Sequence, residues 1–367
     1  MFSWFLFYSL VAIFYYLGLR YTTVIYLNSY KCKLNVIFIC FITFVICATR
    51  DVNLGSDYKT YVAMYQYVDD SQKIPDYLSS RGLLFGYSIL ISSFLNIPYN
   101  IYFGFVGALI IFLFIKSNLF YSSDNRFISL TIVFFVFDGF FLWSQSGLRQ
   151  AIAVGIFLYS VRYIISGEFY KYIFFMIIGM GFHSASILLI PAYFIRRFRF
   201  NKLFILILFL LALSGIVEII LVSVIPSIID IIFSKLTFFS GYLQYADIER
   251  IGNSEEVKGT GLAFLFRLIV NLILLYFSGY LIKLMPKLEI VFSLYFFGVI
   301  ITLAFPYSEI IVRYAMFYKM IFPTLFALLL SRFISLPLTL LALGFTALYY
   351  VIFLTQVEQL YSAFMIY

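Results

Sequence analysis

Apolar runs long enough to cross a membrane follow one another through most of the chain, and this feature limits its fold more than any other. A membrane-spanning helix needs about 20 mainly apolar residues, because in lipid the chain must satisfy its own backbone polar groups. The hydrophobic fraction is 64%, against roughly 45–50% in soluble domains. We therefore expect an all-α, polytopic membrane protein that forms a single integral domain over residues 1–367. The runs lie near residues 3–19, 34–49, 99–115, 127–145, 148–165, 203–222, 261–282, 288–304, 311–331 and 334–355.

The tract at residues 170–198 is apolar but basic at both ends, with Lys171 near its start and three arginines near its end. If both ends stay in the cytoplasm, the tract must enter the membrane and return, with a turn near residues 181–184. Each arm of about 12 residues then reaches roughly 18 Å at the rise of an α-helix. His183 is the single histidine of the chain and would lie at the tip of this short hairpin. Polar backbone at that depth needs protein or a water-filled cavity around it, so we expect a cavity there.

The apolar runs and the two hairpin arms together give about 12 transmembrane helices, and residues 82–96 are expected to dip into the membrane and return. In this topology the net charge of +8 follows from the positive-inside rule, and no nucleic-acid partner is needed to explain it. Two hydrophilic segments, near residues 50–82 and 223–260, become extracytoplasmic loops. The first run has no basic residue before it, so we expect a first helix rather than a cleaved signal peptide. The basic residues expected in the cytoplasm are Arg20, Lys31, Lys33, Lys116, Arg126, Arg162, Lys171, Arg196, Arg197, Arg199, Lys202, Lys283, Lys287 and Arg332.

Several charged residues fall near the outer face of this topology, where an ionised group at membrane depth needs a cavity or a partner. Arginine suits a diphosphate, because its planar guanidinium forms bidentate hydrogen bonds to phosphate oxygens and stays cationic at any working pH. A metal ion or other cofactor is then unnecessary, and a single histidine excludes the HExxH metal motif. The three cysteines show no metal or disulfide spacing and are expected to pack. The charged residues are Asp138, Arg149, Arg267, Glu309 and Arg313, joined by Arg50 and Asp57 from the first outer loop.

Each of these residues also has a structural interpretation, and the sequence leaves both open. Arg50 ends an apolar run, where a basic side chain commonly snorkels to the interface. Arg149 lies in the polar run SQSGLRQ between two apolar runs, where it can cap the turn. The remaining alternatives are an i, i+4 pair of Arg313 with Glu309, burial of Arg267 against Asp138, and a packing role for His183.

Four short motifs, in this order, resemble those of the EpsG-type, Wzy-like bacterial polysaccharide polymerases. They are RDVNLGSDYKTY at residues 50–61, GLRQAIA at 147–153, FHSAS at 182–186 and VRYAMFY at 312–318. The resemblance covers about residues 50–318. One departure is clear: that family often carries a glutamate before the dipping segment, where this chain has Arg81 and Gly82.

The resemblance implies a GT-C-like membrane glycosyltransferase in the bacterial inner membrane. Its donor would be a glycan on undecaprenyl diphosphate, and its acceptor would be a hydroxyl of the next undecaprenyl-diphosphate-linked repeat unit. Membrane lipids and a chain-length regulator are the other expected partners. The roles that follow are donor diphosphate binding for Arg149, Arg313 and His183, secondary diphosphate or acceptor contacts for Arg267 and Arg50, and a base or hydroxyl-orienting role for Asp57 or Glu309.

Three other classes compete with a polymerase. An O-antigen ligase uses the same donor, but we expect a longer outer loop in its C-terminal third than residues 223–260 provide. A flippase of the lipid-linked unit also needs a cationic cavity, and an inverted repeat of half-helices, which would favour it, is not evident in the sequence. A membrane acyltransferase would carry histidine and aspartate together on one helix, which the sequence lacks.

Overall fold

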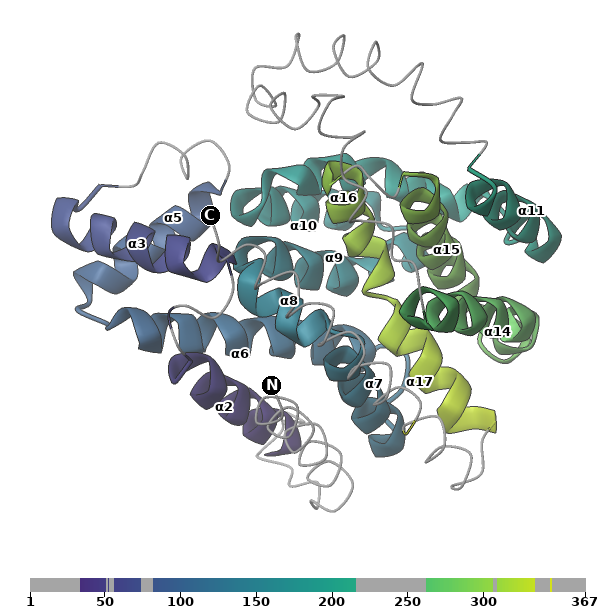
Figure 1. Cartoon of the computed structure of the whole chain (residues 1–367), viewed down its shortest axis with the longest axis horizontal. Helices are drawn as coiled ribbons and strands as arrows, with labels where there is room; N and C mark the ends of the chain where they lie inside the picture. The colour runs from purple at the N-terminus through teal and green to yellow at the C-terminus, as the bar shows by residue number, and fades with distance from the viewer. Residues whose placement is uncertain are drawn as a thin grey trace, which may run out of the picture. The chain divides into compact units, whose positions relative to one another are not determined.

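The computed structural model describes residues 34–50, 52, 56–73, 82–215, 262–305, 309–333 and 344, and every regular element in these ranges is a helix (Figure 1). The predicted first helix at residues 3–19 and the outer loop at 223–260 lie outside the described residues, as does nearly all of the predicted span at 334–355.

The described helices belong to two compact units. The first unit combines Met1–Tyr193 with Pro323–Tyr367, and the second is Phe194–Phe322. The single integral domain expected from the sequence stays a prediction. The helices of the first unit are α2 (Leu34–Ala48), α3 (Ser56–Ser71), α5 (Leu83–Phe94), α6 (Tyr99–Asn118), α7 (Asn125–Phe137), α8 (Phe140–Ser146), α9 (Leu148–Ser166), α10 (Phe169–Phe182), most of the 3₁₀ helix η1 (Ser184–Arg197) and nearly all of α17 (Phe322–Phe333). Those of the second are α11 (Lys202–Leu213), α14 (Leu262–Leu284), α15 (Leu288–Ala304) and α16 (Glu309–Lys319).

Among the described residues, 4 helices are long and apolar enough to cross a membrane: Tyr99–Asn118, Leu148–Ser166, Phe264–Leu284 and Ile311–Arg332. A fifth span is possible if α7 and α8, which meet at an angle of 59°, are one broken crossing. The sequence predicts one uninterrupted run at 127–145, but the chain turns at Gly139, whose φ of 80° is a conformation that glycine adopts at little cost. The total of about 12 transmembrane helices stays a prediction.

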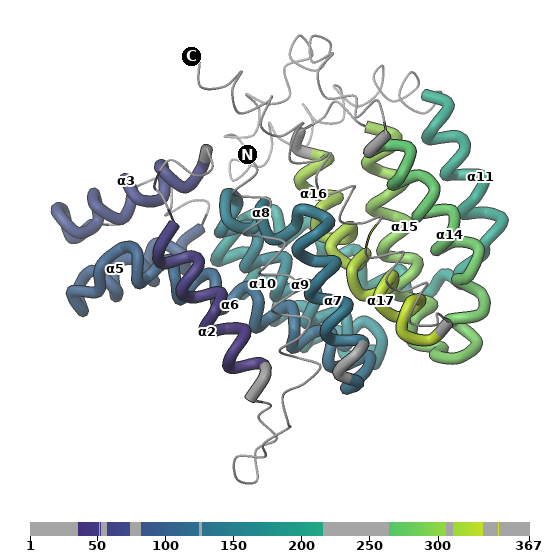
Figure 2. Tube along the Cα trace, turned by 60° about the horizontal axis from the view of Figure 1, so that its bottom comes forward, coloured from purple at the N-terminus to yellow at the C-terminus, as the bar shows by residue number. Residues whose placement is uncertain are grey.

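The core of the first unit is built around α3, a helix inside the segment that the sequence marks only as an outer loop. The side chains of Tyr58, Tyr61, Val62, Tyr65 and Val68 recur at helical spacing and are all buried. They pack with residues of α5, α6 and α9, and Figures 1 and 2 both show α3 beside α5. The opposite side of α3 is polar and exposed, so one face of this helix docks on apolar helices while the other meets solvent.

Hydrogen bonds fix the far end of α3 and the neighbouring helices. The Ser93 hydroxyl donates to Asp69 Oδ1 at 2.7 Å and accepts from Gln72 Nε2 at 3.1 Å, which ties α3 to the end of α5. The hydroxyls of Ser88 and Tyr102 lie 2.7 Å apart and join α5 to α6. These bonds satisfy polar groups on helix faces that are otherwise apolar, and they set the register in which α3 lies.

Glycines allow α2 and α6 to approach closely, as small residues do in membrane helix pairs. A Cβ atom added at Gly107 would lie 2.3 Å from the sulfur of Cys47, and one added at Gly104 would lie 2.8 Å from the ring of Phe44. Cys47 is fully buried in this contact. The prediction that Cys47 is a packing residue is therefore confirmed, although its thiol also contacts the site described below.

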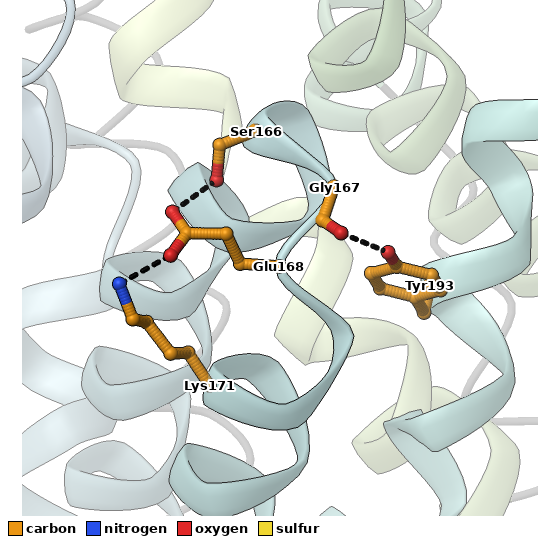
Figure 3. A network of polar contacts seen from close by, with 5 residues as sticks. All are labelled: Ser166, Gly167, Glu168, Lys171 and Tyr193. Atoms are coloured by element: carbon orange, nitrogen blue, oxygen red, sulfur yellow. Dashed lines mark hydrogen bonds and ion pairs between the residues drawn. The ribbon is translucent and has the colours of Figure 1, made fainter.

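The tract around His183 turns back on itself, as the sequence predicts. The hydroxyl of Tyr193 donates to the carbonyl oxygen of Gly167 at 2.7 Å, and that of Tyr172 donates to Leu189 at 2.6 Å. These bonds pair the start of α10 with the end of η1, so the two ends of the hairpin meet (Figure 3).

The polar groups at the base of this hairpin cluster where α9 ends and α10 begins. Glu168 accepts from the hydroxyl of Ser166 at 2.8 Å and forms an ion pair with Lys171 (Figure 3). The hydrogen bond from Lys171 holds the pKa of the Glu168 carboxyl below its ordinary value. Gly167, with a φ of 81°, ends α9 and starts the turn into this cluster.

The second arm of the hairpin differs from the α-helix expected. η1 is a 3₁₀ helix of 14 residues that contains Pro191. A proline inside an α-helix lacks the required N–H and clashes with the carbonyl four residues earlier, so the tighter 3₁₀ form is one way to continue the chain. At the 3₁₀ rise η1 is roughly 28 Å long, against about 21 Å for the 14 residues of α10.

In the second unit, α15 and α16 also meet at a glycine. A Cβ at Gly298 would lie 2.5 Å from the Cβ of Tyr318. The backbone N–H of Phe200 donates to Glu289 Oε1 at 2.9 Å, and Lys202 Nζ donates to the carbonyl oxygen of Tyr276 at 2.9 Å. These bonds join the start of α11 and the residues just before it to the start of α15 and to the interior of α14.

Replacement of Gly107 by alanine is expected to destabilise the protein by about 1–3 kcal/mol, because its Cβ would overlap the buried Cys47 sulfur. The matched control is Gly279→Ala, where nothing lies within 4 Å of the new Cβ. Thermal unfolding of both variants in detergent checks this prediction. Equal melting temperatures would show that the α2–α6 contact relaxes without cost.

Candidate functional site

Arg50 follows the end of α2 and is held on two sides by neutral groups. Its Nη1 nitrogen donates to the carbonyl oxygen of Gln145 at 2.7 Å and to the Gln145 side-chain Oε1 at 3.0 Å. Its Cζ atom lies 3.3 Å from the centroid of the Tyr58 ring, so the guanidinium rests on an aromatic face. This positive charge is thus fixed in place by a carbonyl, an amide and a ring.

Gln145 orients Arg50 from the last turn of α8. Its side chain is 3% exposed, and its Oε1 also accepts from the thiol of Cys47 at 2.9 Å. Carbonyls in the last turn of a helix have no partner within that helix, so the Gln145 carbonyl is available to Arg50. The end of α8 at Gly147 thus creates the acceptor that holds the cation.

Tyr58 connects this cluster to α3. Burial raises the pKa of its phenol, and the nearby Arg50 guanidinium opposes part of that rise. The phenol is therefore protonated at neutral pH and presents a neutral ring to the cation. Because α3 lies in the predicted extracytoplasmic loop, the ring is offered from the outer side of that topology.

Arg149 lies in the first turn of α9 and is buried, with 8% of its surface exposed. Its Cζ is 5.8 Å from the centroid of the Tyr61 ring, one helical turn along α3 from Tyr58. A Cβ at Gly82 would lie 3.3 Å from Arg149 Nη1 and 2.9 Å from the carbonyl oxygen of Phe182. Gly82 is therefore a place where only a glycine lets α5, Arg149 and the hairpin turn approach one another.

His183 directly follows α10 and is half-buried in the turn of the hairpin. Its backbone is extended, with φ of −147°, and its N–H donates to the carbonyl oxygen of Gly179 at 2.8 Å. The preceding residue, Phe182, is the one whose carbonyl lies at Gly82 beside Arg149. The turn that carries His183 thus belongs to the same part of the first unit as Arg149.

The structure therefore brings together two of the predicted arginines and the histidine turn. Asp57 lies next to Tyr58 in the first turn of α3 and is half-buried. The other three predicted residues lie in the second unit, where Arg267 is half-buried on α14, Arg313 is exposed on α16 and Glu309 begins α16. Within the described part of the chain, no three His, Cys, Asp or Glu side chains group closely enough to hold a metal ion.

Sequence reasoning missed four contributors to this cluster, namely Gln145, Tyr58, Tyr61 and Gly82. Each had a signal. Gln145 belongs to the polar run SQSGLRQ, which is unusual between two apolar runs, and the tyrosines stand at helical spacing in the outer loop. Gly82 follows Arg81 in the short stretch where the resemblance led us to expect a glutamate, and the close approach at Gly82 leaves no room for a side chain there.

These features define a helical membrane protein that places two buried or half-buried arginines against successive tyrosines of an amphipathic helix. The sequence matches the model of the EpsG family over residues 33–367, and the chain belongs to the EpsG family. The family predicted from the four motifs is confirmed. Comparison with curated proteins and with solved structures gave no match.

The topology can be tested with single cysteines at exposed, uncharged positions. We expect Thr60→Cys on α3 to react with an impermeant thiol reagent in intact cells, and Phe198→Cys, between η1 and α11, to react only after permeabilisation. Neither change alters a basic residue, so the charge asymmetry that sets orientation is preserved. The parent protein gives the background from its own cysteines. Reaction of Phe198→Cys in intact cells would contradict the cytoplasmic placement of the hairpin base.

Proposed function

We propose that the protein is a polysaccharide polymerase of the bacterial inner membrane. It transfers a growing glycan from undecaprenyl diphosphate to a hydroxyl of the next undecaprenyl-diphosphate-linked repeat unit at the outer face of that membrane. The match to the EpsG family supports the class, and the fixed arginines of the first unit support the leaving group. About 12 transmembrane helices in a GT-C-like arrangement are part of the same proposal.

The chemistry that such a transfer requires fits an arginine cluster. Negative charge builds on the phosphate oxygens as the bond from sugar to diphosphate breaks, and cations held in place before the reaction stabilise that charge. Arg149 contributes from a buried position over Tyr61, Arg50 lies over Tyr58 one helical turn away on α3, and His183 follows Phe182, whose carbonyl lies at Gly82 beside Arg149. Because guanidinium stays charged at any working pH, the donor diphosphate can be neutralised without a metal ion.

The acceptor hydroxyl must be oriented and loses its proton during the transfer, which calls for a carboxylate. Asp57 is the candidate in the first unit, where it precedes the tyrosine under Arg50. Glu309 is the candidate in the second unit. Arg313 keeps the donor-diphosphate role expected from the sequence, and Arg267 keeps its secondary role as a diphosphate or acceptor contact.

A cell without this protein distinguishes the polymerase from its two main rivals. We expect such a cell to assemble, flip and attach single repeat units, so that its surface glycan changes from a ladder of lengths to single-unit bands. A ligase would instead leave no attached glycan and would accumulate lipid-linked polymer. A flippase would leave single units on the cytoplasmic face of the membrane.

The purified protein in detergent should generate ladders from undecaprenyl-diphosphate-linked repeat units alone, with EDTA present and no nucleotide sugar. Repeat units can be extracted from the cell that lacks the protein. No product longer than one unit from a demonstrably folded sample would contradict the polymerase. A strict need for a divalent metal would contradict neutralisation by arginine even if ladders form.

Arg149→Lys is expected to lower the rate of ladder formation by about 10²-fold or more, because lysine cannot form the planar bidentate contact of a guanidinium. The matched control is Arg162→Lys at the other end of α9, whose guanidinium also rests on a tyrosine, with Cζ 3.8 Å from the Tyr159 centroid. We expect this control to polymerise normally. Wild-type ladders from Arg149→Lys would show that Arg149 has a structural role.

A further inference from the structure

We propose that Arg50 binds one oxyanion group through its Nε and Nη2 nitrogens, and that Gln145 is the positioning residue that leaves these two nitrogens without a hydrogen bond to the described residues. The chemistry recognised is a pair of anionic oxygens, from either a phosphoryl group or a sugar carboxylate. The identification of the phosphoryl source with a lipid diphosphate rests on the proposed function.

The hydrogen bonds between Arg50 and Gln145 use one nitrogen of the guanidinium only. Both bonds to Gln145 come from Nη1, and the Tyr58 ring covers one face of the guanidinium. Nε and Nη2 are buried and have no hydrogen-bond partner among the described residues. A buried donor on a charged group without a partner is costly, so a folded protein retains one mainly where a ligand supplies the acceptor.

The two nitrogens without partners form a single edge of the guanidinium plane. Their N–H bonds point the same way, which matches the spacing of two oxygens on a phosphate or a carboxylate. Nη1, which donates to Gln145, lies in the same plane but away from this edge. The described residues therefore accept hydrogen bonds only from Nη1, and the edge formed by Nε and Nη2, which suits bidentate binding, has no partner among them.

Arg162 is a second arginine over a tyrosine ring, and its hydrogen-bond partners can be compared with those of Arg50. Its guanidinium also lies over a tyrosine, but its Nε donates to the carbonyl oxygen of Tyr159 at 2.9 Å and its Nη2 donates to that of Lys116 at 3.0 Å. Backbone carbonyls thus accept from the Nε and Nη2 of Arg162, whereas the same two nitrogens of Arg50 have no partner among the described residues. The difference between the two arginines lies in which nitrogens the protein engages, since both rest on aromatic rings.

The orientation of the Gln145 amide explains why Nη1 is engaged. Its Oε1 accepts from both Arg50 and the buried thiol of Cys47, so two donors hold the oxygen, and not the amide nitrogen, toward the arginine. The amide is neutral and leaves the positive charge of Arg50 available to an anion. A carboxylate at the same position would neutralise that charge and compete with the ligand.

The test titrates the purified full-length protein in detergent with inorganic pyrophosphate and measures binding as a rise in melting temperature. A separate titration uses glucuronate as the carboxylate probe. We expect at least one probe to stabilise the wild type. Arg50→Lys and Gln145→Leu should each weaken its apparent affinity by about tenfold or more, the effect of one charge-assisted hydrogen bond. Arg162→Lys is the matched control and should bind as the wild type does.

Measuring both probe affinity and melting temperature distinguishes a positioning role of Gln145 from a role in stability alone. Gln145→Leu keeps the main-chain carbonyl and an apolar side chain of similar size, so its melting temperature without ligand should change little while its affinity falls. Cys47→Ser retains a donor to Oε1 and should bind more tightly than Cys47→Ala, which has none. Wild-type affinity in Arg50→Lys and Gln145→Leu, or no stabilisation of the wild type by either probe, would overturn the proposal.

The polymerisation assay distinguishes this proposal from the proposed function. Ladders from the wild type that persist at the wild-type rate in Arg50→Lys would leave the polymerase standing and overturn the role of Arg50. If the wild type formed no ladders but bound pyrophosphate, and Arg50→Lys and Gln145→Leu lost that binding, the polymerase proposal would be contradicted and the oxyanion site would be supported. Pyrophosphate binding without glucuronate binding identifies the phosphoryl source, and the reverse identifies an acidic sugar.

Discussion

Burial of the aromatic face of α3 is the interaction on which the described site depends. The helix is too polar on one side to enter lipid and too aromatic on the other to stay in water, so it docks on the apolar helices beside it. Docking places Tyr58 and Tyr61 under two guanidiniums, one helical turn apart. Hydrogen bonds at the other end of α3 fix its register, so the position of each ring follows from contacts far from the cations.

Neutral groups hold Arg50 in this site, and this choice has an electrostatic consequence. Carbonyl and amide oxygens accept its hydrogen bonds, and a ring stabilises its face, but none of these removes its charge. A carboxylate would give a stronger pair and would also neutralise the arginine. A cation held by neutral partners remains attractive to an anion, and it is already oriented before the anion arrives.

The sequence predicts more of the helices than of the site. Apolar runs identify α2, α6, α9 and α15 nearly residue by residue, because lipid imposes a length and composition on every crossing. Basic residues at both ends predict the hairpin at His183, which the Tyr193–Gly167 bond confirms. Gln145 escapes prediction because its role depends on where α8 stops, and that end depends on a local turn. α3 was not predicted for a different reason. Its apolar residues recur at helical spacing, but the many polar residues of the same segment led to its assignment as a loop.

Cys47 joins the packing of two helices to the orientation of the site. Its sulfur fills the space over Gly107 on one side and donates to Gln145 on the other. A change in the tilt of α2 against α6 would therefore move the Cys47 sulfur, and with it the Gln145 amide that accepts from Arg50. Membrane helices change their tilt when the thickness of the hydrocarbon layer departs from their own length. The geometry of the cation is thus linked to the thickness of the bilayer in which the protein works, and detergents or lipids of different chain length are not equivalent solvents for it.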